Sequence, residues 1–437
     1  MTYKLSLYNN IIRINNSHTI LFNSYNMESI LLKNCILEDG EELKRKMKSD
    51  KLLYNQLLET GMLVPEEKNE VEELELRIQS GQNNSDHFIL HINPTLDCNF
   101  NCWYCYENHI SGSKMNPSVL SGVKKRISGI LDSSNIKQLN ISFFGGEPLM
   151  HFEEVAKEII THTSKECESK SKSFRISFTT NGYLFNDSII EWLSHFPCSF
   201  QITLDGGSLA HNKTRFLKGG EGSFDRIVEN VYKLVEHHLH VIVRVNYTEG
   251  NIYTVGDIFE SFKDLWKNYS EYVSFDFQRV WQERNNTEEE TELKMMGIRK
   301  LFRESGATVH DNFLLRDVRF PCYGDKKNYL LVNYNGDVFK CTARDFLSKN
   351  RIGKLMESGE IEFDSELLKA RNESKFSKKV CRDCRVAPLC GGACIQKAYE
   401  LRHHEECTLG YTEEDKDNVI INILDWAITN DKVAEKN

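Results

Sequence analysis

Residues 97–107 read DCNFNCWYCYE, and this run places Cys98, Cys102 and Cys105 within eight residues. The spacing C-x3-C-x2-C supplies three thiolates, whereas a closed iron–sulfur or zinc site normally takes four ligands. One metal coordination position would therefore stay free. Because an iron with a free position can bind a substrate, the run predicts an open metal centre.

With the aromatic Tyr104 just before its last cysteine, the run resembles the cluster motif of the radical S-adenosylmethionine (SAM) enzymes. The resemblance implies a [4Fe-4S] cluster whose free iron chelates SAM and passes one electron to its sulfonium, which gives a 5'-deoxyadenosyl radical. It also implies an electron donor such as flavodoxin or ferredoxin. The alternatives are a zinc knuckle or three unrelated thiols, since cysteine is among the most buried residue types.

Ten of the 13 cysteines fall into two blocks of recognisable spacing, and the other three are Cys35, Cys167 and Cys198. The C-terminal block resembles the SPASM extension of peptide-modifying radical SAM enzymes, which houses two auxiliary [4Fe-4S] clusters. By position, the outer cluster would be held by Cys381, Cys384, Cys390 and Cys407. The inner cluster would be held by Cys322, Cys341 and Cys394, with Arg316 where some relatives have a fourth cysteine. A pair of zinc sites is the alternative, since C-x2-C pairs are common in zinc ribbons.

The composition is that of a soluble enzyme. A formal net charge of -9 and 27% charged residues argue against a nucleic-acid partner, because such binding depends on neutralising phosphates. No uninterrupted apolar stretch is long enough to cross a bilayer. The first residues, MTYKLSLYNNIIRINN, do not resemble a secretory signal. We therefore expect a cytoplasmic protein with no membrane partner, in a reducing compartment that favours metal binding over disulfides.

The pattern divides the chain into five predicted segments. They are a small α+β unit at 1–64, a linker with one short helix at most at 65–87, a barrel at 88–310, a SPASM domain at 311–412 and a C-terminal helix at 413–437. The linker is expected because residues 65–86 are acidic and then polar, without the apolar density of a core.

The N-terminal unit has short alternating runs separated by Asn-rich turns, which predict antiparallel strands, and two helical stretches follow. In the second stretch, residues 51–61, leucines recur at helical spacing and Gly61 is expected to cap the helix. A short strand, MLVP, follows. This order resembles the recognition element of maturases of ribosomally made peptides, which is a winged-helix-like module. The resemblance implies a precursor peptide whose leader adds as a strand to an exposed edge near residues 17–23. The alternative is a small packing domain that shields the barrel.

From residue 88 onward, short β-rich apolar runs alternate with amphipathic helical stretches, which predicts an α/β fold with a parallel sheet. The expected strands lie at 88–93, 139–146, 174–182, 199–206, 240–248 and 272–280. One helix is expected to begin at the pair Asn116 and Pro117. Six such units suit the partial, TIM-like (β/α)6 barrel of the radical SAM superfamily. Parallel barrels place their chemistry at the C-terminal strand ends, and the cysteine motif directly follows the first strand.

Other strand ends carry the SAM contacts that the resemblance implies. The candidate residues are Tyr104, Gly145, Gly146, Glu147, Pro148, Asn181, Thr203, Asp205, Arg215, Arg244 and Asn246. The GGEP turn at 145–148 is expected to receive the methionine ammonium. Thr203 and Asp205 are expected to bond the ribose or the carboxylate, and Arg215 to pair with that carboxylate through its forked donors. The alternative for each residue is a capping or structural role.

The expected function is hydrogen abstraction from a ribosomally made peptide, followed by an oxidative side-chain crosslink such as a thioether or carbon–carbon bond. A general base is expected among Asp345, Asp317 and Tyr323. The rival enzyme is the anaerobic sulfatase maturase, which forms formylglycine. Two departures argue against it: 97 residues precede the first cysteine of the motif, and Thr342 follows Cys341 where those enzymes generally have Asp. The non-enzymatic alternative is a zinc-bearing interaction protein that holds a partner with its N-terminal unit.

Overall fold

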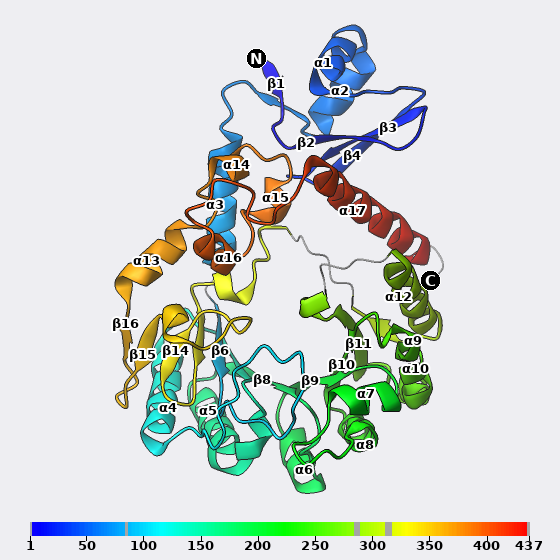
Figure 1. Ribbon diagram of the computed structural model, residues 1–437. Helices are drawn as coiled ribbons and strands as arrows, with labels where there is room; N and C mark the ends of the chain where they lie inside the picture. The colour runs from blue at the N-terminus through cyan, green and yellow to red at the C-terminus, as the bar shows by residue number, and fades with distance from the viewer. Residues whose placement is uncertain (1, 84–85, 284–288, 311–316, 435–437) are drawn as a thin grey trace. The chain divides into compact units, whose positions relative to one another are not determined.

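The computed structural model describes residues 2–83, 86–283, 289–310 and 317–434, which form two compact units (Figure 1). Unit 1 comprises Met1–Asn84, Phe313–Lys327 and Glu366–Asn437. Unit 2 comprises Ser85–Asn312 and Asn328–Ser365. The cysteine-rich segment predicted at 311–412 is thus divided between the units, and Arg316 lies outside the described residues.

Unit 2 is built on an 11-stranded sheet with a parallel part and an antiparallel extension. The first parallel strands, in chain order, are β6 (His87–Ile92), β7 (Gln138–Phe143), β8 (Ser173–Thr180), β9 (Cys198–Leu204), β10 (His240–Tyr247), β11 (Val273–Arg279) and β12 (Thr308–Val309). On the other side of β6 follow β13 (Tyr329–Val332), which is parallel to it, and the antiparallel strands β14 (Asp337–Phe339), β15 (Gly353–Leu355) and β16 (Ile361–Phe363). The six predicted strands and the parallel α/β sheet are therefore confirmed.

Helices connect these strands, and Figure 1 shows α4, α5, α6 and α8 along the outside of the curved sheet. The helices of unit 2 are α4 (Pro117–Asp132), α5 (Lys157–Ser169), α6 (Asp187–Ser194), α7 (Ser208–Thr214), α8 (Phe224–Glu236), α9 (Ile252–Val255), α10 (Asp257–Phe262), α11 (Leu265–Tyr269) and α12 (Glu289–Glu304). Helix α4 begins as expected, because the Asn116 side chain accepts a hydrogen bond of 2.9 Å from the Val119 N–H and Pro117 is the first helical residue.

The core of unit 2 lies on the two faces of the sheet, where side chains alternate between buried and half-buried positions. One aromatic ladder crosses three neighbouring strands at matching register. Phe143 stacks on Phe178 at 4.7 Å between ring centroids, and Phe178 stacks on Phe200 at 5.7 Å. These rings fix the spacing and register of β7, β8 and β9, which positions the loops at their C-terminal ends.

The N-terminal part of unit 1 has two small sheets and two helices. The elements are β1 (Tyr3–Leu5), β2 (Asn9–Arg13), β3 (His18–Asn23), β4 (Glu28–Lys33), α1 (Gly40–Ser49), α2 (Lys51–Glu59) and β5 (Leu63–Pro65). Strand β1 pairs with β5, and the other three strands form an antiparallel sheet in the order β2-β3-β4. The C-cap of α2 is Thr60, one residue before the predicted Gly61, and Gly61 then takes the left-handed conformation with φ +66°.

The expectation of an exposed strand edge near residues 17–23 is wrong. That segment is β3, the central strand, and it pairs with β2 on one side and β4 on the other. Strand β4 was not predicted, because its apolar residues at 30–32 are consecutive instead of alternating. The outer edges of this sheet therefore belong to β2 and β4.

The segment predicted as a linker contains α3 (Glu70–Gln82), a 13-residue helix that packs into unit 1. Leu74 and Ile78 of this helix are buried in one cluster with Tyr8, Phe376 and Cys381. The helix therefore joins the N-terminal sheet to the cysteine-rich part of the same unit.

The remaining elements of unit 1 lie in its cysteine-rich part and at the C-terminal end of the described chain. They are η4 (Tyr323–Asp325), α13 (Ser365–Glu373), α14 (Lys379–Arg382), α15 (Ala387–Cys390), α16 (Ile395–Glu400) and α17 (Glu413–Ala434). Ile420 of α17 is buried with Ile12 and Phe22 of the N-terminal sheet and with Val386 and Leu389. Within the described ranges, no helix is both long and apolar enough to span a membrane.

Candidate active site

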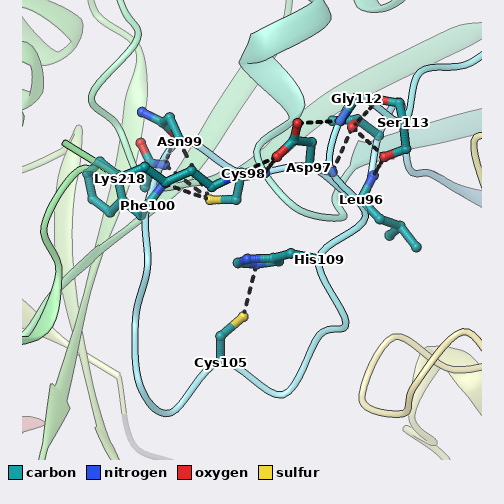
Figure 2. Close-up of polar contacts among 12 residues, drawn as sticks. Leu96, Asp97, Cys98, Asn99, Phe100, Cys105, His109, Gly112, Ser113 and Lys218 are labelled. Carbon is teal, nitrogen blue, oxygen red and sulfur yellow. Dashed lines mark hydrogen bonds and ion pairs between the residues drawn. The ribbon is translucent and has the colours of Figure 1, made fainter.

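The loop that carries the first three cysteines is anchored by Asp97, a residue that the sequence analysis did not single out. One carboxylate oxygen of Asp97 accepts hydrogen bonds from the Cys98 N–H at 2.8 Å and the Lys218 ammonium at 2.7 Å, and the other accepts from the Gly112 N–H at 2.7 Å (Figure 2). Burial alone would raise the pKa of Asp97, but Lys218 and the two N–H groups hold this pKa below its usual value. The two ends of the loop are thus tied to one ionised group.

The charge of Arg215 acts on all three thiols of this loop, and Cys102 acts on both Cys98 and Cys105. Burial raises the pKa of Cys98 to about 12 and that of Cys105 to about 11, while the charge of Arg215 lowers the pKa of Cys98, Cys102 and Cys105. The thiol of Cys105 also lies 3.4 Å from the His109 ring (Figure 2). Thiols with a raised pKa ionise when a metal supplies positive charge, so these three fit a metal centre.

Among the described residues, no three His, Cys, Asp or Glu side chains are grouped around a single metal ion. The ligands of a four-iron cluster are arranged differently, because each cysteine binds a different iron. A cluster held by Cys98, Cys102 and Cys105 therefore does not require three ligands around one metal position.

The GGEP turn after β7 packs backbone to backbone against the cysteine loop. The Gly146 N–H donates to the Thr95 carbonyl at 3.2 Å, and the Glu147 N–H donates to the Asp97 carbonyl at 2.8 Å. A Cβ on Gly145, which has φ +107°, would lie 2.4 Å from the Thr95 oxygen, and a Cβ on Gly146 would lie 2.0 Å from the Asp97 oxygen. Both glycines are therefore required by this close approach.

Glu147 is fully buried, and its carboxylate accepts hydrogen bonds from neighbouring residues of the protein. It accepts hydrogen bonds from the Thr180 hydroxyl at 2.7 Å and from the Asn181 N–H at 2.8 Å. The Asn181 side chain in turn donates to the Asn99 side-chain oxygen at 2.7 Å. Pro148 opens the short helix η1 (Pro148–His151). Glu147 thus joins the ends of β7 and β8 to the cysteine loop.

Tyr104 brings together four other residues predicted for SAM binding. Its hydroxyl donates to Asp205 at 2.8 Å and accepts from Arg215 at 2.8 Å and from the Asn246 amide at 3.1 Å. The side-chain oxygen of Asn246 accepts from Arg244 at 3.1 Å. Burial raises the pKa of Asp205 to about 6, although Arg215 and Tyr104 oppose the shift. This buried network connects the cysteine loop to β9, α7 and β10.

His211 supports this network and was missed by the sequence analysis, which singled out only the arginine of the segment HNKTR. Its Nδ1 accepts from the Asp205 N–H at 3.2 Å, so the proton resides on Nε2, which lies 2.9 Å from the Ser223 hydroxyl. That hydroxyl donates to the Arg215 carbonyl at 2.6 Å. Burial and the charge of Arg215 lower the pKa of His211 well below its usual value, which keeps it neutral. Thr203 is buried on β9 nearby in sequence.

Several buried polar atoms around the cysteine loop have no hydrogen-bond partner among the described residues. They are Nε of Arg215, Nδ2 of Asn99, Oδ1 of Asn93 and both carboxyl oxygens of Glu107. Because an unsatisfied buried polar group is costly, this set of donors and acceptors predicts a polar ligand. These donors and acceptors fit the carboxylate, ammonium and hydroxyl groups of SAM.

Residues 92–265 match the family model described as the radical SAM superfamily. The chain is a radical SAM superfamily enzyme. Over 385 residues this radical SAM enzyme is 23% identical to the radical SAM cyclopropyl synthase TigE of Paramaledivibacter caminithermalis, with 79% of this chain and 77% of TigE covered. It is 22% identical over 345 residues to the cysteine-type anaerobic sulfatase-maturating enzyme of Clostridium perfringens strain 13, with 72% and 90% covered.

Solved structures of other proteins share the fold of the radical SAM enzyme. The structure described as native anSMEcpe with bound AdoMet (SAM) has a TM-score of 0.55 at 20% identity and covers 77% of this chain and 99% of that chain. Streptococcus suis SuiB bound to its precursor peptide SuiA has a TM-score of 0.52 at 15% identity and covers 91% of this chain and 96% of that chain. The superfamily implies a SAM-binding [4Fe-4S] cluster, and the residues described above fit both groups.

The four predicted ligands of the outer cluster lie together in unit 1 of the radical SAM enzyme. Burial raises the pKa of Cys381 to about 11, and the neighbouring thiols that add to this shift are Cys390, Cys407 and Cys384. The Cys390 sulfur accepts a hydrogen bond from the Ala393 N–H at 3.2 Å. The three residues after Cys390 all have positive φ, at +57°, +80° and +72°, and this turn points N–H groups toward the sulfur.

The predicted inner ligands belong to different units: Cys322 and Cys394 to unit 1, and Cys341 to unit 2. Their assignment to one cluster stays a prediction. The Cys341 and Cys394 sulfurs each accept a backbone N–H, at 3.3 Å and 3.4 Å, as the Cys98 sulfur does at 3.4 Å. Such bonds favour the thiolate form. Cys167, which lies outside both motifs, instead donates to a carbonyl at 4.0 Å.

The three candidate bases have different surroundings. Burial would raise the pKa of Asp317, but ion pairs with Arg319 at 2.6 Å and Arg77 at 2.9 Å hold it below its usual value, so this carboxylate is a weak base. Asp345 accepts from an amide at 2.6 Å and lies 3.2 Å from a lysine ammonium. Tyr323 is half-buried in η4.

Proposed function

We propose that this radical SAM enzyme modifies a ribosomally made precursor peptide and installs an oxidative side-chain crosslink, such as a thioether or carbon–carbon bond. The observation that carries the proposal is the extent of the likeness. The structure of SuiB bound to its precursor peptide covers 91% of this chain. The anSMEcpe structure covers only 77% of this chain, although 99% of anSMEcpe itself is matched. The additional part of this chain is consistent with a peptide-recognition unit.

Cys98, Cys102 and Cys105 are the residues that would hold the first cluster, close to the open donors of Arg215 and Asn99. When bound, the cluster and SAM supply an electron and a 5'-deoxyadenosyl radical that removes hydrogen from an unactivated carbon. Arg215 would pair with the SAM carboxylate through Nε, which has no hydrogen-bond partner among the described residues, while Nη1 of the same guanidinium donates to Tyr104. The burial of this network excludes water from the reacting centre.

The C-terminal cysteines are proposed to hold two auxiliary [4Fe-4S] clusters. Support comes from the effect of Cys390, Cys407 and Cys384 on the pKa of Cys381 and from the backbone N–H groups that face Cys341, Cys390 and Cys394. An oxidative crosslink leaves an electron on the substrate, and an auxiliary cluster is a suitable acceptor. Flavodoxin or ferredoxin is the proposed donor to the first cluster.

The leader of the precursor peptide is proposed to bind at the outer edge of β4. Strand β2 forms the opposite edge of the sheet, and its Ile12 packs in one cluster with Ile420 of α17. Strand β4 exposes Leu31 by 49%, and no described strand pairs with its outer edge. Strand addition there uses main-chain hydrogen bonds for affinity.

Co-expression with a short peptide encoded beside the gene tests the proposal. We expect the peptide to lose the mass of two hydrogen atoms and tandem mass spectrometry to locate a crosslink. We also expect leader peptides with N-methylated backbone amides to bind more weakly than the unmodified leader. An unmodified peptide in cells with a fully iron-loaded enzyme would contradict the proposed reaction.

Formylglycine formation is the second candidate, favoured by the 90% coverage of the C. perfringens sulfatase-maturating enzyme. It predicts conversion of one Cys or Ser to an aldehyde without a crosslink, and an aldehyde-reactive hydrazide distinguishes the two products. A zinc-bearing interaction protein predicts stoichiometric zinc and no SAM cleavage after anaerobic reconstitution. The proposed enzyme instead predicts about twelve iron atoms per chain, from three four-iron clusters.

A further inference from the structure

Lys378 is a buried lysine without a carboxylate partner. Its exposed fraction is 7%, and it is the only buried lysine among the described residues. Its ammonium donates to the Glu406 carbonyl at 3.1 Å, and no described carboxylate lies within 4.0 Å of it. Taking an ammonium out of water is costly unless a negative charge lies close by. The position therefore requires an anion that the described carboxylates do not supply.

The surroundings of Lys378 identify where that anion belongs. The Lys378 carbonyl accepts the Cys381 N–H at 3.0 Å, so Lys378 begins the turn that carries Cys381. Its side chain ends at the carbonyl of Glu406, the residue before Cys407. Lys378 therefore reaches from one predicted ligand of the outer cluster to another. Its charge also lowers the pKa of the Cys381 thiol, against the effect of burial.

Two other lysines near the outer thiols are already neutralised. Lys375 pairs with Asp325 at 2.9 Å, and Lys416 pairs with Glu413 at 2.5 Å. Their charges act on Cys390 and Cys384, respectively, but each is offset by its carboxylate. Of these three lysines, Lys378 is therefore the one that has no carboxylate partner among the described residues.

We propose that Lys378 is the buried counter-charge of the auxiliary iron–sulfur cluster held by Cys381, Cys384, Cys390 and Cys407, and that it raises the reduction potential of that cluster. The inference rests on the proposed auxiliary cluster and is independent of the peptide substrate. One-electron reduction adds a negative charge to the cluster, and a fixed ammonium in a dry environment stabilises the reduced form more than the oxidised form. Lys378 is therefore a positioning residue that makes this cluster a better electron acceptor.

The test compares Lys378→Met with the matched control Lys379→Met, whose parent residue is the exposed neighbour in the chain. Both are made in holoenzyme carrying Cys98→Ala, Cys102→Ala and Cys105→Ala, so that only auxiliary clusters contribute. Iron is counted first, and midpoint potentials are then measured by redox titration followed by electron paramagnetic resonance. The signal that disappears in a Cys384→Ala variant identifies the outer cluster.

We expect Lys378→Met to move the midpoint of the outer cluster to a more negative potential, while Lys379→Met and the charge-conserving Lys378→Arg leave it near the parent value. Loss of four iron atoms from Lys378→Met, with retention in Lys378→Arg, would also support the counter-charge role. The proposal would be overturned if the midpoint potential of the outer cluster were unchanged in Lys378→Met, or if Lys378→Arg shifted it equally. It would also be overturned if the Cys384→Ala change removed no iron from the parent protein. A shifted midpoint in an enzyme that leaves every peptide unmodified would contradict only the proposed function.

Discussion

The hydroxyl of Tyr104 donates a hydrogen bond of 2.8 Å to the buried carboxylate of Asp205. The two residues lie 101 positions apart in the chain, one in the cysteine loop and the other at the end of β9. The same hydroxyl accepts from Arg215, whose Nε is left for a ligand. The position of the cysteine loop and the orientation of the predicted SAM-binding residues therefore depend on one phenol.

Tyr104→Phe should weaken SAM binding while the iron content is preserved. The change removes three hydrogen bonds and leaves Asp205 and Arg215 partly unsatisfied, which costs about 1–3 kcal/mol and raises the KM for SAM about five- to a hundredfold. The measurement is 5'-deoxyadenosine formation against SAM concentration. Tyr272→Phe, just before β11 and therefore at the opposite strand end, is the control. An unchanged KM in Tyr104→Phe would show that the network does not orient SAM.

Gly146→Ala should abolish SAM cleavage. Its Cβ would lie 2.0 Å from a backbone oxygen of Asp97, so the cysteine loop must move, at an expected cost of about 2 kcal/mol or more. Gly129→Ala, at an exposed position in the last turn of α4, is the control, because its Cβ meets nothing within 4 Å and alanine favours the helix by up to about 1 kcal/mol. Thermal unfolding and iron content check both variants. Wild-type iron binding and activity in Gly146→Ala would refute the close packing of these two loops.

Asp205 should make the stability of the apoprotein depend on pH. Its folded-state pKa of about 6 is above the usual 3.8, so its contribution to stability is fully present below pH 3.8 and is lost as the pH rises through about 6. The loss is on the order of 1–3 kcal/mol. In Asp205→Asn this part of the pH dependence should disappear, whatever the variant's absolute stability. Urea unfolding between pH 4 and pH 7 measures it, with the exposed Asp225→Asn as control. Parallel curves for wild type and Asp205→Asn would contradict the assignment.

Arg385→Ala should loosen the N-terminal sheet. The Arg385 guanidinium donates to Asn10 at 2.8 Å and to Glu413 at 3.0 Å, and its carbonyl accepts from Ser24 at 2.5 Å. Losing the side-chain bonds should cost about 1–3 kcal/mol, so amide exchange in residues 9–23 should become faster and leader affinity should fall severalfold. Hydrogen exchange mass spectrometry measures the first effect. In the control Arg402→Ala, the exposed guanidinium that is lost donates to the Tyr399 carbonyl of its own turn, so both quantities should stay unchanged.

This point variant is more informative than deletion of residues 1–64. Deletion would remove Tyr8, Ile12 and Phe22 from cores that also contain Cys381, Val386 and Leu389. The cysteine-rich part would then lose packing as well as its recognition unit. Exchange rates in Arg385→Ala equal to those of wild type would mean that the N-terminal sheet is held by its own core alone.

Local signals in the sequence predicted the parallel sheet and α4, because alternating apolar runs and the Asn116–Pro117 pair depend on neighbouring residues. Helix α3 was underestimated, since its acidic composition hides Leu74 and Ile78, which lie one helical turn apart. The edge of the N-terminal sheet was misplaced because β4 was not recognised.

Spacing identified the cysteines and the strand-end residues of the candidate site. The supporting residues could not be found in this way. Asp97 fixes the cysteine loop through Lys218, which lies 121 positions away, and His211 acts on Asp205 through a backbone N–H. Lys378 is one of many lysines in the sequence, and only its burial distinguishes it. Such roles arise from the folded arrangement of loops and leave no local pattern.

Hydrogen transfer from a deuterated precursor peptide tests the central claim most directly. The reconstituted enzyme is incubated anaerobically with SAM, a reductant and peptide deuterated on its side-chain carbons, and both products are analysed by mass spectrometry. The account predicts deuterium in 5'-deoxyadenosine, together with a crosslinked peptide. Unlabelled 5'-deoxyadenosine together with an intact peptide would contradict it.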